Sequence, residues 1–342
     1  GRMPTLIIGA ILASVTNLFG LMLSVFVRPA VRTMPIHLVQ SSIEGTGKGM
    51  LINSLIGELL LGGSVQPAQM MEREEEKEKR ITTLIIEGST VIHIDNLPGG
   101  GTLDSPSLCS LTTSETWKGR MLGYSSMPTL PNNLILIASG NNIHGTGEIV
   151  RRVVPIWMQP KNDHPEDRND FIHPNIQGYA RSRRREAVAM LIGMWDSWKR
   201  AGMPMGSARL GGFESWVGPV GGCMELFKGA DGWLDNRKDW GEQANDFGSS
   251  LRELVTAWNI KFGDTPVNAS DILDLITEKK IFPDVLARQE SGRLISLGRK
   301  VLAPMCDRPV GNYMVVRVKN PSTQAWTYKL TGGSNKEEPV DF

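Results

Sequence analysis

The sequence contains little cysteine and almost no excess charge of either sign. Its three cysteines, Cys109, Cys223 and Cys306, are far apart, and no C-x-x-C pair occurs. This spacing argues against a paired-cysteine zinc site or redox pair and fits a reducing cytoplasm. The 37 basic and 36 acidic residues give a formal net charge of +1, so the whole chain carries no electrostatic signature of nucleic-acid binding. Only a local basic surface could therefore indicate nucleic-acid binding.

At 342 residues the chain is long enough for two or three domains. Its composition, 40% hydrophobic and 21% charged, is that of an ordinary globular protein rather than a disordered or fibrous one. The first four residues, GRMP, resemble a cloning remnant on an internal fragment, which leaves open a further N-terminal domain.

One apolar segment raises the question of a membrane. Residues 5–27 contain no charged side chain, which is enough for a spanning helix, and Arg28 and Arg32 follow them. The alternative is a helix buried in a large core. The polar residues that dilute the segment are Ser14, Thr16, Asn17 and Ser24. We therefore predict a buried helix and no contact with a membrane.

Apolar runs alternate with helix-like segments in the first 160 residues. Strands are expected at 36–39, 90–94, 134–138 and 153–158, and helical patterns at 50–61 and 71–80. Continuous apolar runs are typical of parallel strands that are buried on both faces. We therefore predict an α/β domain with a parallel sheet over residues 1–160.

The rest of the sequence predicts helices and a final hairpin. Residues 161–245 contain a helix at 183–201 and end in a polar connector at 237–245. In residues 246–342 we expect helices at 247–262, after 268–270 and at 290–302, then strands at 313–318 and 325–330. Helices followed by a small hairpin suggest a winged helix.

A glycine-rich turn follows the first apolar run. Consecutive backbone N–H groups at a helix N-terminus can cradle phosphates while a lysine reaches the β and γ groups, and Gly45, Gly47 and Lys48 fit this pattern. The match to G-x-x-x-x-G-K-[ST] is incomplete, because Ser42 and Gly49 stand where a glycine and a hydroxyl residue are expected. An ordinary tight connection is the alternative.

Three further elements follow in order. Asp95 ends the second strand, where a carboxylate holds Mg²⁺, although it could instead start a turn. Asn141 follows the third strand and could place an amide beside the γ-phosphate, with a simple turn as the alternative. Arg151 and Arg152 precede the fourth strand and could act as an arginine finger or form a surface salt bridge.

The order and spacing of these elements resemble the AAA+ helicases attached to primases of phages and integrated mobile elements, relatives of the minichromosome maintenance helicases. The matching stretches lie between residues 4 and 330 and are Pro35–Leu38, Glu44–Gly49, Ile94–Asn96, Leu111–Thr112, Trp117, Arg120, Leu122–Gly123, Gly140–Asn142, Arg151–Arg152, Gly212–Trp216 and Gly221–Gly222. The resemblance implies an AAA+ P-loop NTPase core at 1–160, a helical lid at 161–245, and a linker helix with a winged-helix domain at 246–342.

The resemblance also implies roles for single residues with ATP and Mg²⁺ as cofactors. Lys48 would bind phosphate, Asp95 would position Mg²⁺, Asn141 would be the first sensor, and Arg152, or Arg151, would act on a neighbouring subunit's nucleotide. The residues expected around the nucleotide are Glu44, Gly45, Thr46, Gly47, Lys48, Gly49 and Met50. Asn96 stands where many relatives have the water-activating glutamate, and Glu76 is our candidate for that acid, with a solvated helix face as the alternative.

DNA contact is expected from a projecting hairpin within 114–131. It carries Trp117, Lys118, Arg120 and Tyr124, which combine aromatic faces for stacking with positive charge for phosphates. A purely structural hairpin is the alternative. The expected winged helix could hold duplex DNA or a protein.

These expectations describe a cytoplasmic, ATP-dependent DNA helicase. It would form a homo-oligomeric ring, as a hexamer, hydrolyse ATP between subunits and move along single-stranded and forked DNA, with a primase domain or partner. An AAA+ protein remodeller or helicase loader that acts on a protein partner is the alternative. A non-enzymatic interaction module is a third, because Gly49 and Asn96 weaken the positions that serve the metal and the water.

Overall fold

The computed structural model describes residues 5–69, 73–95, 102–119, 128–145, 147–160, 164–307, 309–310, 312–319 and 326–332. The chain folds into two compact units, of which the first ends at Gly241 and the second begins at Glu242. The last domain boundary predicted from the sequence, after residue 245, lies close to this division. The predicted core and the predicted lid share the first unit.

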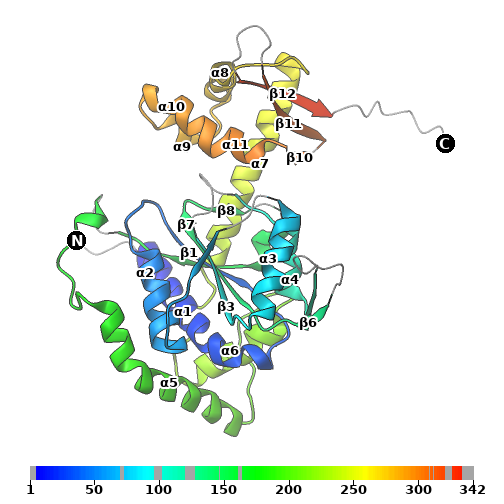
Figure 1. Cartoon of the computed structure of the whole chain (residues 1–342). Coiled ribbons are helices and arrows are strands. Elements are labelled where there is room, and N and C mark those ends of the chain that lie inside the picture. Colours follow the sequence, from blue (N-terminus) through cyan, green and yellow to red (C-terminus); the bar gives the residue numbers. More distant parts are fainter. Residues whose placement is uncertain are drawn as a thin grey trace. The chain divides into compact units, whose positions relative to one another are not determined.

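The first unit is built on a sheet of five parallel strands (Figure 1). Its strands are β1 (Ile36–Ser41), β2 (Pro67–Gln69), β3 (Val91–Asp95), β7 (Ile135–Asn141) and β9 (Val153–Trp157). They lie in the order β2-β3-β7-β1-β9, and every neighbouring pair is parallel. The four predicted strands are confirmed. Because all strands run the same way, their carboxyl ends meet at one edge of the sheet.

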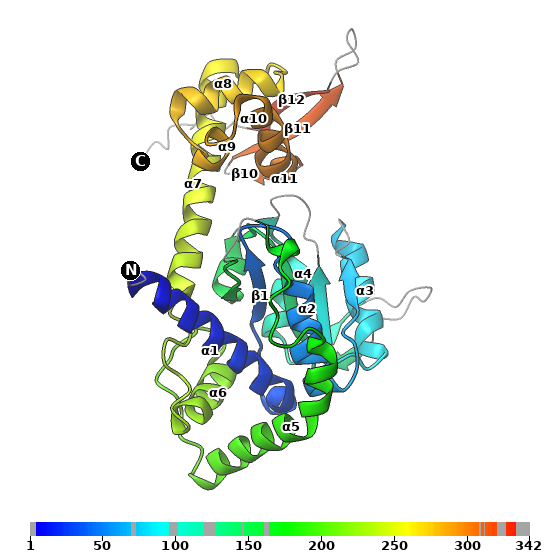
Figure 2. The ribbon, with the colours of Figure 1, turned by 90° about the vertical axis from the view of Figure 1, so that its left-hand side faces the viewer.

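Helices cover both faces of this sheet (Figure 2). On one face lie α1 (Thr5–Val27), the continuous helical segment α2–η2 (Lys48–Ile52 and Asn53–Leu61), α5 (Ile176–Arg200) and α6 (Glu214–Leu226). On the other lie α3 (Glu74–Ile86) and α4 (Pro106–Thr113). Alternation along β1 explains the two cores, because Val39 packs on the first face and Leu38 on the second.

Short elements connect the larger ones in this part of the chain. They are η1 (Arg28–Ala30), β4 (Thr102–Leu103), β5 (Thr116–Lys118), β6 (Thr129–Pro131), β8 (His144–Gly145), η3 (Gly147–Arg152) and η4 (Pro165–Asp167). β5 and β6 pair antiparallel, so the hairpin predicted within 114–131 is present.

The long apolar segment at the start of the chain forms α1. By length and composition, Ile11–Ala30 is the one described stretch that would pass as a membrane span, but 61% of its most apolar 18-residue window is buried. Asn17 donates to the carbonyl of Pro155 (2.8 Å) and to Asn236 Oδ1 (2.9 Å), and it accepts from the backbone N–H of Leu234 (3.0 Å). Its amide is therefore satisfied by protein groups. In this fold α1 is a core helix.

The second unit has a hydrophobic core of its own, which includes Trp258, Leu275 and Val301. Its helices are the greater part of α7 (Arg237–Phe262), α8 (Ala269–Lys279), α9 (Pro283–Leu286), and α10 (Glu290–Leu297), which continues through η5 (Gly298–Leu302) into α11 (Ala303–Met305). Three antiparallel strands follow, β10 (Pro309–Val310), β11 (Tyr313–Lys319) and β12 (Trp326–Gly332). The predicted hairpin is confirmed, and the short β10 adds a third strand.

The predicted polar connector at 237–245 is wrong, because α7 begins at Arg237 and continues to Phe262. Trp240, which is 1% exposed, anchors the start of the helix in the core of the first unit. Arg237 adds hydrogen bonds to the carbonyls of Arg151 (2.7 Å) and Val153 (2.9 Å). A polar composition is typical of an exposed helix as well as of a connector, so composition alone could not separate the two.

Candidate nucleotide-binding site

The glycine-rich turn after β1 forms an open loop that leads directly into α2. Gly45 and Gly47 have φ angles of +73° and +82°, in the left-handed region that favours glycine. A Cβ at Gly45 would also lie 2.8 Å from the carboxylate of Glu166, whereas one at Gly47 or Gly49 would meet no atom within 4 Å. Gly47 immediately precedes the helix that starts at Lys48. The free N–H groups of this helix start are therefore at an open surface, as a phosphate cradle needs.

Lys48 joins this loop to the neighbouring strand. Its ammonium donates to Asn141 Oδ1 at 2.6 Å and to Thr46 Oγ1 at 3.2 Å. Burial lowers the pKa of Lys48, while the carboxylates of Asp95 and Glu44 act in the opposite direction. The lysine is therefore bonded to an amide at the end of β7 and is close enough to the carboxylate at the end of β3 for the two charges to interact. The predicted residues Lys48, Asp95 and Asn141 are brought together.

Asp95 is held by a hydrogen-bonded chain that runs into the core. Ser139 Oγ donates to Asp95 Oδ1 at 2.5 Å and lies 2.8 Å from His93 Nε2. Since the hydroxyl has one proton, His93 must donate its Nε2–H to Ser139. Burial lowers the pKa of His93, although the Asp95 charge raises it, and this favours the neutral ring.

Ser139 and His93 were not predicted from the sequence. Both are buried, and both lie two residues before a predicted site residue on the same strand, Asn141 in β7 and Asp95 in β3. Side chains two residues apart in a strand share a face. This periodicity was the signal that could have identified them.

No family model matches the chain, and no curated protein shows significant similarity to it.

The site fits a polyphosphate better than a protein-only metal site. Within the described part of the chain, no group of three or more His, Cys, Asp or Glu side chains is placed to hold a metal ion. Mg²⁺ in nucleotide sites needs only one or two carboxylates together with phosphate oxygens and water. Asp95 fits that requirement. Gly49 has no hydroxyl to contribute as a direct ligand.

Glu76, the candidate water-activating acid, lies on α3. Its carboxylate accepts from the ammonium of Lys79 at 2.7 Å, and its side chain is 46% exposed. The role of Glu76 stays a prediction. The nearby Glu74 is instead structural, because it accepts from the backbone N–H (3.1 Å) and hydroxyl (2.6 Å) of Ser107 at the start of α4.

Arg151 and Arg152 lie at the opposite edge of the sheet from the loop. They end η3, and the next residue, Val153, pairs with Ile36 at the start of β1. Along a strand, the five residue-to-residue steps from Ile36 to Ser41 span about 16 Å. Both guanidinium groups bond the carboxylate of Glu148, and Arg152 also donates to its carbonyl at 2.8 Å. The side chain of Arg151 is 64% exposed, against 12% for Arg152.

The predicted stacking role of Trp117 is wrong. Its side chain is 4% exposed, packs in the core beside α3 and donates its indole N–H to Thr82 Oγ1 at 2.9 Å. The burial of the large apolar ring outweighs any gain from exposing it. Lys118 is exposed on the same strand. Arg120 and Tyr124 lie outside the described residues.

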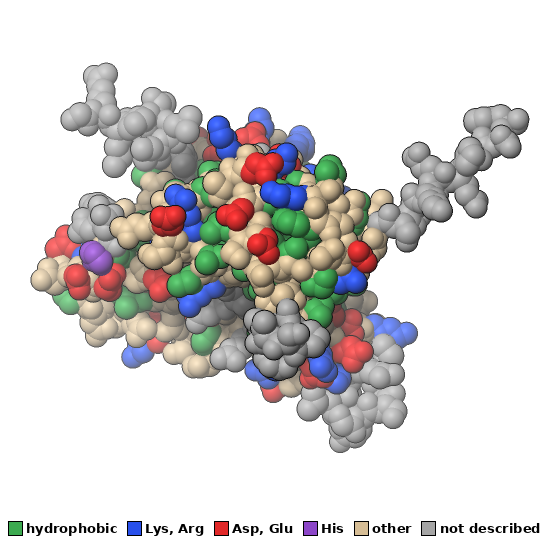
Figure 3. Space-filling view, turned by 90° about the horizontal axis from the view of Figure 1, so that it is seen from above, with side chains coloured by type: hydrophobic (Ala, Val, Ile, Leu, Met, Phe, Trp, Pro, Cys, Tyr) green, Lys and Arg blue, Asp and Glu red, His purple; other side chains and the backbone are tan. Residues whose placement is uncertain are grey.

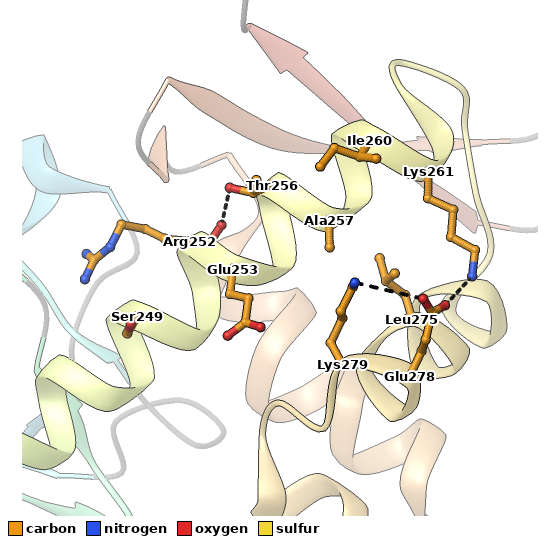
Figure 4. A pocket seen from close by; sticks show the side chains of 10 residues that line it. All are labelled: Ser249, Arg252, Glu253, Thr256, Ala257, Ile260, Lys261, Leu275, Glu278 and Lys279. Atoms are coloured by element: carbon orange, nitrogen blue, oxygen red, sulfur yellow. Dashed lines mark hydrogen bonds and ion pairs between the residues drawn. The ribbon is translucent and has the colours of Figure 1, made fainter.

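The second unit contains a groove of about 600 Å³ between α7 and α8 (Figure 4). Its charged side chains largely compensate one another, because Glu278 pairs with Lys261 at 2.9 Å and with Lys279 at 4.0 Å. Figure 3 shows a similar mixture of positive and negative side chains on the face that it draws.

Proposed function

We propose that this chain is the ATPase part of a ring-shaped DNA helicase of the AAA+ class, with a winged-helix domain after its motor core. The position of Lys48 carries the proposal, because its ammonium bonds Asn141 and faces Asp95 at one edge of the sheet. The neighbouring strands β1, β7 and β3 bring together a phosphate loop, an amide and a carboxylate. Phosphoryl transfer requires these groups for positioning and charge stabilisation.

Each residue has a distinct task in this proposal. Bound ATP with Mg²⁺ would supply the triphosphate whose terminal group is transferred to water. Lys48 and the loop N–H groups bind phosphate oxygens, and Asp95 holds the metal through water. Ser139 keeps the Asp95 carboxylate in one orientation. Asn141, which is bonded to Lys48 in this structure, orients the attacking water without adding charge.

The arginine pair supports a site that is shared between subunits. Arg151 and Arg152 lie at the edge of the sheet that is remote from the loop of their own chain. A guanidinium on that edge can stabilise transferred charge only in a neighbouring subunit. The proposed enzyme is therefore the assembled ring, and each interface takes its lysine from one subunit and its arginine from the next.

The function is tested by an ATPase titration with single-stranded and duplex DNA, together with a mass measurement with and without nucleotide. We expect assembly in nucleotide and stimulation by single strands. Lys48→Ala should abolish turnover, because the loop loses the cation that would bind the phosphate oxygens. Unchanged turnover in this variant would contradict the proposal.

An AAA+ protein remodeller or helicase loader is the second candidate. The burial of Trp117 favours it, because the predicted hairpin loses its stacking surface for DNA. ATPase activity that is indifferent to single-stranded DNA but stimulated by a protein partner would support this second function.

A further inference from the structure

The β11–β12 hairpin of the second unit exposes a tryptophan beside two cations. All nine tryptophans are described, and Trp326 is 49% exposed, whereas the other eight are buried or half-buried. Large aromatic rings usually bury most of their surface, so the exposed ring of Trp326 is available for a contact. The guanidinium of Arg317 lies 4.3 Å from the Trp326 ring centre, and the ammonium of Lys319 lies 5.9 Å from it.

Strand register places this cluster on one face of the hairpin. In the hairpin of β11 and β12, Lys319 pairs directly with Trp326, and Arg317 pairs with Tyr328. Cross-strand partners point to the same side of a sheet. The next pair on that side, Val315 and Leu330, is buried in the core. The face therefore starts in the core and becomes solvent-exposed, aromatic and basic toward the end of the hairpin.

The charge of this segment suits an anion. Residues 308–335 contain four cations and no aspartate or glutamate. Of these cations, Lys329 pairs with Asp264 at 3.6 Å, whereas Arg317 and Lys319 lie against the tryptophan. A flat ring flanked by cations fits a base and its phosphates better than an acidic peptide, which has no flat face to stack.

We propose that Trp326, Arg317 and Lys319 form a binding face for single-stranded DNA, in which a base stacks on Trp326 and the two cations contact phosphates. This deepens the proposed function, and the choice of DNA over RNA rests on that function. The binding itself needs no nucleotide hydrolysis. The proposal assigns DNA contact to Trp326 in the second unit and not to Trp117, which is buried.

The test measures binding of the full chain to labelled oligothymidine of about 20 nucleotides, longer than typical single-strand sites, by fluorescence anisotropy without ATP. Trp326→Ala should weaken binding roughly tenfold or more, and Trp326→Phe should restore most of it. Lys319→Gln should lower the slope of log affinity against log salt by about 0.7, the loss of one single-strand phosphate contact.

Phe171→Ala is the matched control, because Phe171 is 48% exposed and also lies under an arginine, Arg168, at 4.8 Å. It should bind as the unmodified chain does. Equal affinities of the Trp326→Ala and Phe171→Ala variants would overturn the proposal. So would equal binding of oligouridine, or competition by polyglutamate as strong as that by oligothymidine.

Two further checks keep the outcome unambiguous. Thermal melting establishes that Trp326→Ala is folded, and if it is not, the exposed Lys319→Glu variant must lose binding instead. Both variants are assayed for ATPase activity without DNA. Loss of DNA binding with normal basal turnover supports the face, and intact DNA binding with normal turnover rejects it while leaving the ATPase proposal standing.

Discussion

At the residue scale, the hydrogen bond from Ser139 to Asp95 is the contact with the clearest consequence for the site. Ser139→Ala removes the donor to the carboxylate and leaves the buried Nε2–H of His93 without its acceptor. An unsatisfied buried group of this kind costs about 1–3 kcal/mol. We expect that loss in the free energy of unfolding, together with weaker Mg²⁺-dependent nucleotide binding, measured by titrating Mg²⁺ at fixed nucleotide.

Ser24→Ala is the control that separates the loss of stability from the loss of Mg²⁺-dependent nucleotide binding expected for Ser139→Ala. Ser24 is also fully buried, and it accepts from the indole N–H of Trp216 at 2.8 Å, outside the phosphate loop and its partner strands. It should lower stability without changing the Mg²⁺ dependence. If both serine variants shift nucleotide affinity alike, Ser139 has only a structural role.

His37 makes a prediction about pH. It is fully buried in a T-shaped contact with Trp216, and burial lowers its pKa to about 3. The unfolded chain, with a pKa near 6.5, therefore binds more protons between these values, so stability is present above pH 6.5 and is lost as pH falls toward 3. Between pH 6.5 and 4.5 the loss amounts to about 2–3 kcal/mol.

His37→Leu should remove this part of the pH dependence. Urea unfolding of both proteins at pH 7 and pH 4.5 measures it, because the other titrating groups are common to the pair and cancel in the difference. Parallel losses of stability in the two proteins would show that His37 does not titrate as burial implies.

At the element scale, α5 packs against the helical segment that follows the glycine-rich loop, and an ion pair between Arg181 and Glu58 joins the two. Arg181 donates to both carboxylate oxygens of Glu58, at 2.9 and 3.0 Å, and the Glu58 side chain is 6% exposed. Arg181→Ala leaves this carboxylate without its partner, so we expect a lower melting temperature. Adding Glu58→Gln should recover part of the loss, because the unpaired charge is removed.

Arg183→Ala is the control for that experiment. Arg183 comes from the same basic run but pairs with Glu186 at the surface, where both side chains are more than half exposed. Exposed pairs contribute little, so its melting temperature should stay close to that of the unmodified chain. A similar shift of the melting temperature in both variants would show that the ion pair between Arg181 and Glu58 stabilises the fold no more than an exposed pair does.

At the scale of the whole molecule, the loop with Lys48 and the Arg151–Arg152 pair lie at opposite ends of the parallel strands. The proposal therefore predicts that subunits with a defect at one end restore the activity of subunits with a defect at the other. Lys48→Ala and a double Arg151→Ala, Arg152→Ala variant should each be inactive as pure rings. When they are mixed, some interfaces combine an intact lysine from one subunit with intact arginines from the next, so ATPase activity should partly return. The measurement is turnover against mixing ratio after subunit exchange.

A cis arrangement gives the opposite result in that mixture. Every chain then carries one defect in its own site, and no ratio restores turnover. The arginine double variant alone should still bind nucleotide with near-normal affinity, because its own loop is unchanged and remote from the substitutions.

Sequence periodicity was sufficient for four of the five strands of the main sheet and for the carboxyl ends of three of them. The apolar runs located β1, β3, β7 and β9, and the glycine spacing located the loop that contains Lys48. Since parallel strands align their carboxyl ends, these local patterns already implied that Asp95 and Asn141 lie near the loop. The structure brings Lys48 to both of them.

Only the tertiary structure decided which side chains are buried and which distant ones touch. It placed Trp117 in the core and joined His93 to Ser139, 46 positions away. It also continued α7 through the expected connector. A local pattern reports the face on which a side chain lies. Contact across a core depends on strand order, register and the volume left by neighbouring helices, and these are properties of the assembled fold.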